Sequence, residues 1–437
     1  MMLLFSILSG NGQARYTKQM YLSSFLSLKL NFFIVFTHFE SRTTSSDIPP
    51  HHSVPLFCPP AAEQTHNRLA KAGASVYNAR VSAAKHPAMC DFNERPFILF
   101  WEVTRACALA CRHCRAIAQP KAHPLELSHE EAMELTDKIA ALAPPMLVLT
   151  GGDPMMRRDI FDIIQRAAGA GLRVALSPAA TPRLLNTDFR KLREAGVVSM
   201  SLSLDGATQE SHDNFRRVPH TFERTLKAAQ MAKEAGIQLQ INTTVARSTM
   251  AEMPAFIELM KQISPDVWSV FLLVPTGRAT RDDLPTAEQL EELWQQLLDL
   301  RRELPFAIKT TEGHHYRRAL MQAARREGTP PPRHLVPTRD GKGVVFISHI
   351  GEIQPSGFLP VTAGNVRTDD LATIYRTHPI FTALRNDDAL GGKCGVCEYR
   401  HLCGGSRARA YGTGGDMFGA EPLCNYIPAA LRGNTQP

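Results

Sequence analysis

The stretch Phe100–Ala116, FWEVTRACALACRHCRA, runs from an extended apolar segment into a loop that carries three cysteines. These are Cys107, Cys111 and Cys114, in the pattern CxxxCxxC. Three thiolates on one short loop can ligate three irons of a cubane 4Fe–4S cluster, whereas a fully ligated cluster takes four cysteines. One iron then stays open to a ligand from outside the chain. The pattern therefore favours chemistry at the cluster over plain electron transfer.

A structural zinc site is the alternative interpretation of this loop. Such a site needs a fourth Cys or His close by, and His113 is the local candidate. Because His113 directly precedes Cys114, the two side chains are awkward ligands for one ion. The triplet therefore favours iron and sulfide over zinc.

A second apolar segment, Met146–Leu149, ends in Thr150–Pro154, TGGDP. Alone, this motif is ordinary turn chemistry. Placed after CxxxCxxC, it resembles the radical S-adenosylmethionine (SAM) superfamily, in which a GGE-type motif follows the second strand. The resemblance covers nearly everything from Phe97 to Pro428. It implies that SAM chelates the open iron of a 4Fe–4S cluster and that one-electron reduction releases a 5′-deoxyadenosyl radical.

Strand-like and helix-like segments alternate from Phe97 onward. The expected strands are Phe97–Thr104, Met146–Thr150, Arg173–Ala179, Val197–Leu204, Ile237–Val245 and Val267–Val274. The expected helices are Ser128–Leu142, Leu185–Ala195, Thr221–Ala235 and Met250–Ile263, with Ser128 and Glu131 forming a capping box and Gly196 and Gly236 at C-caps. Six βα units predict an α/β fold with a parallel sheet, and they are too few to close an eight-stranded barrel. We therefore expect a partial (β/α)6 barrel of the radical SAM type.

The motifs of this region fall where ligands gather in such sheets, at the carboxyl ends of the strands. The resemblance implies that Gly151, Gly152 and Asp153 meet the methionine amine of SAM. It likewise places Ser203 and Asn242 near the ribose or carboxylate, and His113 with the turn from Val274 to Gly277 beside adenine. Asp153 stands where the superfamily has Glu and is one methylene shorter, so its contact with the amine is expected to be indirect. Taken singly, these motifs are also common strand exits, and Asn242 could be a satisfied core amide.

A second cysteine set lies near the C-terminus and comprises Cys394, Cys397, Cys403 and Cys424. Four thiolates form a closed metal site, and a set that begins with CxxC is also how zinc ribbons are built. The region resembles the SPASM or twitch extension of radical SAM enzymes, a small Cys-rich α+β domain that houses an auxiliary 4Fe–4S cluster. Ser356 and Ser406 stand where relatives tend to have Cys. We therefore expect one auxiliary cluster.

Several segments resemble the heme-biosynthesis radical SAM enzymes more narrowly, including the branch that makes modified heme in denitrifiers. They are WEVTRAC, CRHCRA, INTT, FLLVPTGR, ISHIGEIQPSG, CEYR and CGGSRARAYGTGGD. The resemblance implies an oxidoreductase that decarboxylates propionate side chains of a tetrapyrrole, with the auxiliary cluster accepting the surplus electron. Candidate partners of the propionates are Arg105, Arg112, Arg115, Arg407 and Arg409. The alternatives are a maturase that modifies a ribosomal peptide or cofactor precursor, and a non-catalytic metal-binding scaffold.

The distribution of charge along the chain bears on its domain organisation and on its binding partners. Residues 1–88 hold eight Lys/Arg against three Asp/Glu, which leaves only +2 of the net charge of +7 for the remainder. The basic balance is thus no argument for nucleic acid. We expect residues 1–88 to be a disordered extension or sequence upstream of a native start at Met89, residues 89–330 to form the radical SAM core, and residues 331–437 to form the auxiliary cluster domain.

The sequence also bears on membrane association, the cellular compartment and the electron donor. The apolar runs of residues 1–88 are far too short for a membrane span. Oxygen-labile clusters and unpaired thiols fit a reducing cytoplasm. A reductase with flavodoxin, or a ferredoxin, is the expected electron donor.

Overall fold

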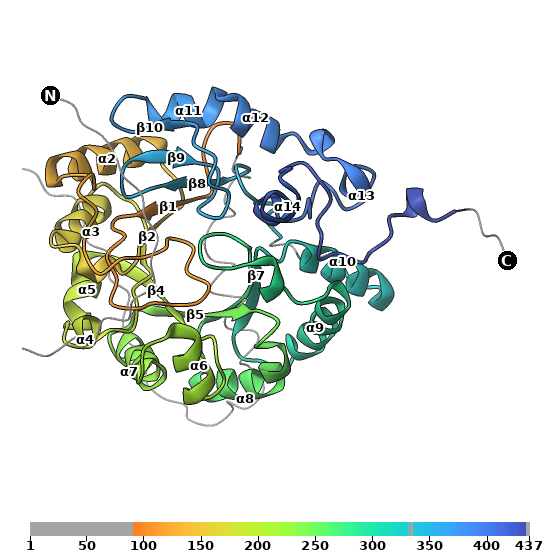
Figure 1. Cartoon of the computed structure of the whole chain (residues 1–437), viewed down its shortest axis with the longest axis horizontal. Helices are drawn as coiled ribbons and strands as arrows, with labels where there is room; N and C mark the ends of the chain where they lie inside the picture. The colour runs from red at the N-terminus through yellow and green to blue at the C-terminus, as the bar shows by residue number, and fades with distance from the viewer. Residues whose placement is uncertain (1–90, 331, 333–334, 434–437) are drawn as a thin grey trace, which may run out of the picture. The chain divides into compact units, whose positions relative to one another are not determined.

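The computed structural model describes residues 91–330, 332 and 335–433. The expectations for residues 1–88 and for a start at Met89 lie outside these residues. The described chain is built around one sheet of ten strands in the order β10-β9-β8-β1-β2-β3-β4-β5-β6-β7 (Figure 1). The strands are β1 Ile98–Glu102, β2 Met146–Thr150, β3 Val174–Leu176, β4 Val197–Ser203, β5 Gln238–Val245, β6 Val267–Leu272, β7 Ala307–Thr311, β8 Val344–Ile347, β9 Glu352–Gln354 and β10 Gly364–Asn365.

Strands β1 to β8 pair in parallel, and β9 and β10 add antiparallel pairs at one edge. The two end strands, β10 and β7, are not paired with each other, so the sheet is open. The expected partial barrel is therefore confirmed, and so are its six predicted strands. The sequence analysis missed β7, whose residues AIKTT are half-buried or exposed and give no clear apolar signal. It also missed β8, which brings the segment after residue 331 into the same sheet.

Helices follow the strands and surround the sheet (Figure 1). They are α2 His129–Leu142, α3 Ile160–Gly169, α4 Pro182–Leu185, α5 Phe189–Ala195, α6 Gln209–Arg216, α7 Thr221–Glu234, α8 Met253–Ile263, α9 Ala287–Leu300, α10 His315–Glu327, α11 Leu371–Thr377, α12 Pro379–Arg385, α13 Gly392–Gly395 and α14 Arg407–Gly414. The predicted capping box of α2 is present, with Ser128 and Glu131 bonded to each other's backbone. The predicted helix Leu185–Ala195 is interrupted, because Asp188 caps a new start at Phe189.

The core lies between the sheet and the helices. In α3, Ile160, Ile163, Ile164 and Ala167 are buried at the spacing of one helix face, and they meet the apolar side chains of the strands. Parallel strands covered in this way are nearly continuous apolar runs, as in MLVLT of β2. Within the described ranges, no helix is both long and apolar enough to cross a membrane.

The register of the sheet positions the two motifs. Glu102 at the end of β1 pairs with Thr150 at the end of β2. The CxxxCxxC loop and the Gly-Gly-Asp turn therefore leave the sheet at the same level, side by side. Ser203 of β4 likewise pairs with Asn242 of β5.

Candidate active site

The cysteine loop, residues 105–119, is closed at its base by backbone pairing. The N–H of Cys107 donates to the carbonyl of Gln119 at 2.8 Å, and the N–H of Gln119 donates to the carbonyl of Arg105 at 3.0 Å. Inside this closure each of the three thiols faces one hydrogen-bond donor. The donors are the N–H of Leu109 at 3.3 Å from Cys107 Sγ, the guanidinium of Arg216 at 3.6 Å from Cys111 Sγ, and the N–H of Ala118 at 3.4 Å from Cys114 Sγ. Such donors stabilise thiolate ligands and tune a bound cluster.

Burial makes two of these thiols, those of Cys107 and Cys111, poor acids on their own. It raises the pKa of Cys107 to about 12, and the nearby Asp153 and the other two thiols add to the rise. The pKa of Cys111 is also raised by burial, against the opposing charge of Arg216. A metal displaces such protons when it binds, and its affinity then depends on pH. Cys107 and Cys111 are therefore not arranged as free thiolates, and metal ligation by the loop stays a prediction.

The turn after β6 also contacts the cysteine loop. Arg278 donates to the carbonyls of Cys111 at 3.2 Å and Ala118 at 2.8 Å, and its own N–H donates to the carbonyl of Cys114 at 3.1 Å. Gly277, with φ of +65°, lies directly against the loop: a Cβ on it would come within 2.5 Å of the Arg115 carbonyl oxygen. Only glycine allows both this backbone conformation and this close approach.

Replacing Gly277 by alanine is expected to destabilise the protein more than the same change at Gly236. Both glycines have positive φ, +65° and +70°, but nothing lies within 4 Å of a Cβ at Gly236. Both variants carry backbone strain, and only Gly277→Ala adds overpacking of about 1–3 kcal/mol. Urea unfolding of the metal-free variants measures the difference, and iron content after reconstitution is expected to fall only in Gly277→Ala. Equal unfolding midpoints would contradict the close approach.

The Gly-Gly-Asp turn lies equally close to the loop. A Cβ on Gly152 would come within 2.5 Å of the Ala106 carbonyl oxygen, and the N–H of Asp153 donates to that carbonyl at 2.8 Å. The Asp153 carboxylate is fully buried and accepts from the N–H of Met155 at 3.1 Å, the hydroxyl of Thr181 at 3.1 Å and the N–H of Ala179 at 3.3 Å. Its side chain thus positions the turn. Contact of Gly151, Gly152 and Asp153 with SAM stays a prediction.

A buried ion pair supports the loop from β4 and α6. Asp205, which follows β4, pairs with Arg216, and its other oxygen accepts from the N–H of Thr244 at 2.8 Å. Burial alone would raise the pKa of Asp205, but Arg216 and two nearby histidines lower it to about 2. A chain of contacts therefore runs from β5 through Asp205 and Arg216 to the thiol of Cys111.

His113 stacks on Phe215, with ring centroids 4.5 Å apart. Burial lowers the pKa of His113 to about 4, so the ring is neutral near pH 7. Its Nδ1 has no hydrogen-bond partner in the part of the chain that the structure describes. The predicted place of this ring beside adenine is untested.

The remaining predicted residues of the SAM pocket lie at strand ends, as expected. Ser203 and Asn242 are half-buried neighbours on β4 and β5, and Asn242 accepts from the amide of Gln240 at 2.6 Å. Val274 is buried just beyond β6, in the turn that continues to Gly277. The fold therefore brings all of them to the edge of the sheet that carries the cysteine loop.

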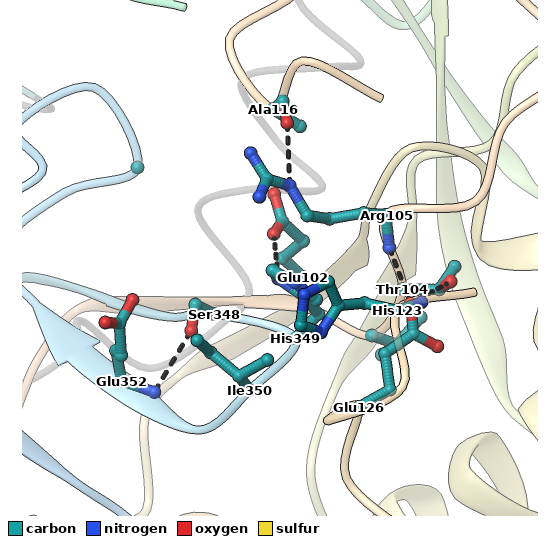
Figure 2. A network of polar contacts seen from close by, with 12 residues as sticks. Glu102, Thr104, Arg105, Ala116, His123, Glu126, Ser348, His349, Ile350 and Glu352 are labelled. Carbon is teal, nitrogen blue, oxygen red and sulfur yellow. Dashed lines mark hydrogen bonds and ion pairs between the residues drawn. The ribbon is translucent and has the colours of Figure 1, made fainter. Parts of the chain in front are cut away.

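Figure 2 shows a second polar network at the end of β1. Glu102 accepts from Arg115 Nη2 at 2.7 Å and lies 2.8 Å from His349 Nδ1. Glu126 accepts from the hydroxyl of Thr104 at 2.8 Å and from the N–H of Arg105 at 3.0 Å. These bonds tie the cysteine loop to the segment that follows β8.

Most of the arginines predicted to pair with propionates already have partners within the protein. Arg115 is paired with Glu102, and Arg105 donates to the carbonyl of Ala116 at 2.7 Å. Arg407 and Arg409 are fully buried, and Arg409 makes a bidentate pair with Glu421 at 2.8 and 3.0 Å. These arginines hold the fold together, whereas Arg112 is exposed.

The four C-terminal thiols line one small hollow that is partly open to solvent. Cys394 lies in α13, Cys397 and Cys403 lie between α13 and α14, and Cys424 lies beyond α14. Burial raises the pKa of Cys403 to about 12 and that of Cys424 to about 11. We call this space the auxiliary hollow. Its lining is His315, Arg318, Lys393, Cys394, Cys397, Tyr399, Arg400, Cys403, Gly404, Gly405, Glu421, Cys424, Tyr426 and Pro428.

Sequence reasoning missed the residues that support the cysteine loop. Arg216 ends the stretch HDNFR at residues 212–216, and Arg278 ends the segment FLLVPTGR. The available signal was an arginine that follows a strand closely, at the end of α6 after β4 and in the turn after β6. Glu102 and His349 gave no such signal, because 247 residues of sequence separate them. His315 gave none either, because only the fold brings it to the C-terminal cysteines.

The fold and the loop together define a partial barrel with three closely spaced thiols at the carboxyl end of its sheet. The Radical SAM superfamily profile matches residues 101–260. The chain is 41% identical over 340 residues to an AdoMet-dependent heme synthase from Oleidesulfovibrio alaskensis, covering 76% of this chain and 87% of that protein. It is 38% identical to one from Methanosarcina barkeri, covering 78% and 99%. The crystal structure of Streptococcus suis SuiB bound to S-adenosylmethionine has the same fold, with a TM-score of 0.59 and 18% identity over 80% of this chain and 82% of that one.

The chain therefore belongs to the radical SAM superfamily, and it is an iron–sulfur enzyme. Within the superfamily it is related to the AdoMet-dependent heme synthases, and the superfamily implies SAM and a 4Fe–4S cluster as its cofactors.

Proposed function

We propose that this enzyme oxidatively decarboxylates propionate side chains of a tetrapyrrole. The observation that carries the proposal is the identity of 41% over 340 residues to a protein named as a heme synthase. That match covers 76% of this chain and 87% of that protein. Substrate, auxiliary cluster and reaction are our proposals for this chain.

The residues of the cysteine loop fit the 4Fe–4S cluster that the superfamily implies. Cys107, Cys111 and Cys114 would hold it, since each thiol faces a donor and none is engaged in a disulfide. When bound, the cluster supplies the electron that cleaves SAM to methionine and a 5′-deoxyadenosyl radical. SAM would be positioned by the predicted pocket residues at the strand ends and in the cysteine loop. They are Gly151, Gly152, Asp153, Ser203, Asn242, Val274, Gly277 and His113. Burial of Cys107 and Cys111 would limit the access of water to the reacting centre.

The proposed reaction is balanced as follows. One hydrogen atom passes from the propionate carbon next to the ring to the deoxyadenosyl radical. The carbon–carboxylate bond then breaks, carbon dioxide leaves, and a vinyl group forms with loss of one electron. That electron needs an acceptor, and Cys394, Cys397, Cys403 and Cys424 would hold one in the auxiliary hollow. Four thiols around such a space support a cluster over a single zinc ion.

The surroundings belong to the same proposal. Oxygen-labile clusters need a reducing compartment, so we propose a cytoplasmic enzyme that receives electrons from a flavodoxin and its reductase or from a ferredoxin. We also propose that residues 89–330 form the radical SAM core and that residues 331–437 form the auxiliary cluster domain.

Anaerobic incubation of reconstituted enzyme with SAM, dithionite and iron-coproporphyrin tests the reaction. We expect vinyl products by mass spectrometry, with one deoxyadenosine formed for each carboxylate lost. Deoxyadenosine that forms only when a precursor peptide is supplied would favour a peptide maturase instead. No deoxyadenosine under any condition, with two zinc ions per chain, would leave a metal-binding scaffold.

A further inference from the structure

His315 is a buried histidine whose two ring nitrogens have no partner among the described residues. Its side chain is fully buried, and neither Nδ1 nor Nε2 makes a hydrogen bond to the protein. The ring lines the auxiliary hollow together with all four C-terminal cysteines. A buried polar group without a hydrogen-bond partner destabilises a folded protein. The arrangement is therefore incomplete until something in the hollow bonds to the imidazole.

The cationic side chains around the hollow already have partners of their own. Arg318 pairs with Glu291, the ammonium of Lys393 donates to the carbonyl of Cys424, and Arg400 lies 3.1 Å from a carboxylate oxygen of Asp388. His315 is different, because its hydrogen-bonding capacity is unused.

The ring is also held in place. His315 is the first residue of α10, and it packs edge-on against the fully buried Trp294, with ring centroids 5.1 Å apart. A packed ring cannot turn away to solvent to satisfy its nitrogens. Its N–H can thus serve only an acceptor within the hollow.

We propose that His315 donates a hydrogen bond to a sulfur of the auxiliary 4Fe–4S cluster and thereby raises the reduction potential of that cluster. This inference rests on the proposed function, which places a cluster there. Hydrogen bonds to the sulfurs stabilise the more negative, reduced state and are one of the ways in which proteins set cluster potentials. The effect favours electron acceptance, which the loss of carbon dioxide from the substrate requires. His315 is then a positioning residue for the electron acceptor.

The test removes the donor and keeps the volume. It uses the full chain with Cys107, Cys111 and Cys114 replaced by alanine, so that only the auxiliary site can hold iron. In this background His315→Phe is expected to shift the reduction equilibrium about tenfold toward the oxidised cluster, a drop of about 59 mV for a one-electron couple. His315→Gln keeps an N–H donor and should recover part of the shift. His314→Gln is the matched control, since His314 is the buried neighbour but does not line the hollow. A redox titration followed by electron paramagnetic resonance measures each potential.

The outcomes separate this inference from the proposed function. A site that takes up zinc, or no iron, in the parent background overturns both. Iron and sulfide at four per chain with an unchanged potential in His315→Phe overturns the role of His315 alone. If His315→Phe fails to retain iron, labelling histidine with ¹⁵N in the parent decides the matter. Hyperfine coupling from one histidine N–H to the reduced cluster, lost in His315→Gln and kept in His314→Gln, supports the bond; no such coupling overturns it.

Discussion

Replacing Cys107 by alanine is expected to lower the iron content from about eight to about four atoms per chain and to abolish the formation of 5′-deoxyadenosine. Cys107 is buried at the start of the cysteine loop, and its thiol accepts from the N–H of Leu109. With one of three ligands missing, the neighbouring thiols cannot close a cluster, and SAM loses the iron that it must chelate. Iron and sulfide analysis together with chromatographic detection of deoxyadenosine measures both effects.

Cys403→Ala provides the matched comparison, because it removes one ligand from the other set. It is also expected to lose about four irons and to melt at a lower temperature, since its Gly-rich loops have little core of their own. The three thiols of the cysteine loop are untouched, so deoxyadenosine should still form, uncoupled from substrate oxidation. Equal loss of deoxyadenosine in both variants would contradict the assignment of the two sets to different tasks.

Asp205→Asn is expected to cost about 3–5 kcal/mol in the free energy of unfolding. The Asp205 side chain is 0% exposed and pairs with Arg216, whose side chain is 12% exposed and contacts Cys111. The substitution leaves a buried guanidinium without its counter-charge. The midpoint of urea unfolding of the metal-free protein should fall while the slope stays the same.

An exposed ion pair supplies the control for this change. Arg166 and Asp137 lie 2.7 Å apart, but their side chains are 53% and 50% exposed. Asp137→Asn is expected to change the free energy of unfolding by less than about 1 kcal/mol, because solvent screens such pairs. A comparable loss in both variants would show that burial of the Asp205 pair is not what stabilises it.

The Asp205 pair also predicts a pH dependence. The pKa of Asp205 is lowered to about 2 in the folded protein, against about 3.9 for an unfolded chain. A depressed carboxyl pKa stabilises the fold above the unfolded value, and that contribution is lost as the pH falls through about 2. Unfolding curves measured between about pH 4 and pH 2 should therefore converge for the wild type and Asp205→Asn. Parallel curves would contradict an ionised Asp205.

Local sequence was enough to predict the barrel and to single out the cysteines that we propose as metal ligands. The six strands from Phe97 to Val274 are short apolar runs separated by helix-period segments, and both signals are encoded within a few residues. The thiols of Cys107, Cys111 and Cys114 belong to one loop, so their spacing alone limits what they can bind. The same holds for the Gly-Gly-Asp turn, whose place beside the loop follows once β1 and β2 are neighbours.

The residues that contact and position the cysteine loop could be found only from the tertiary structure. Arg216 reaches Cys111 across 105 residues of sequence, and His349 reaches Glu102 across 247. Strand β8 pairs with β1 although strands β2 to β7 separate the two in the sequence. Strand β7 has too little apolar character to be recognised from its sequence.

The sequence by itself thus determined the kind of sheet and the spacing of the thiols that we propose to hold iron, because cysteine spacing and strand periodicity are local. The tertiary structure alone decided which charges are buried beside those thiols and that His315 faces the auxiliary hollow without a partner. Burial and pairing depend on segments brought together from far along the chain, and no local pattern encodes them.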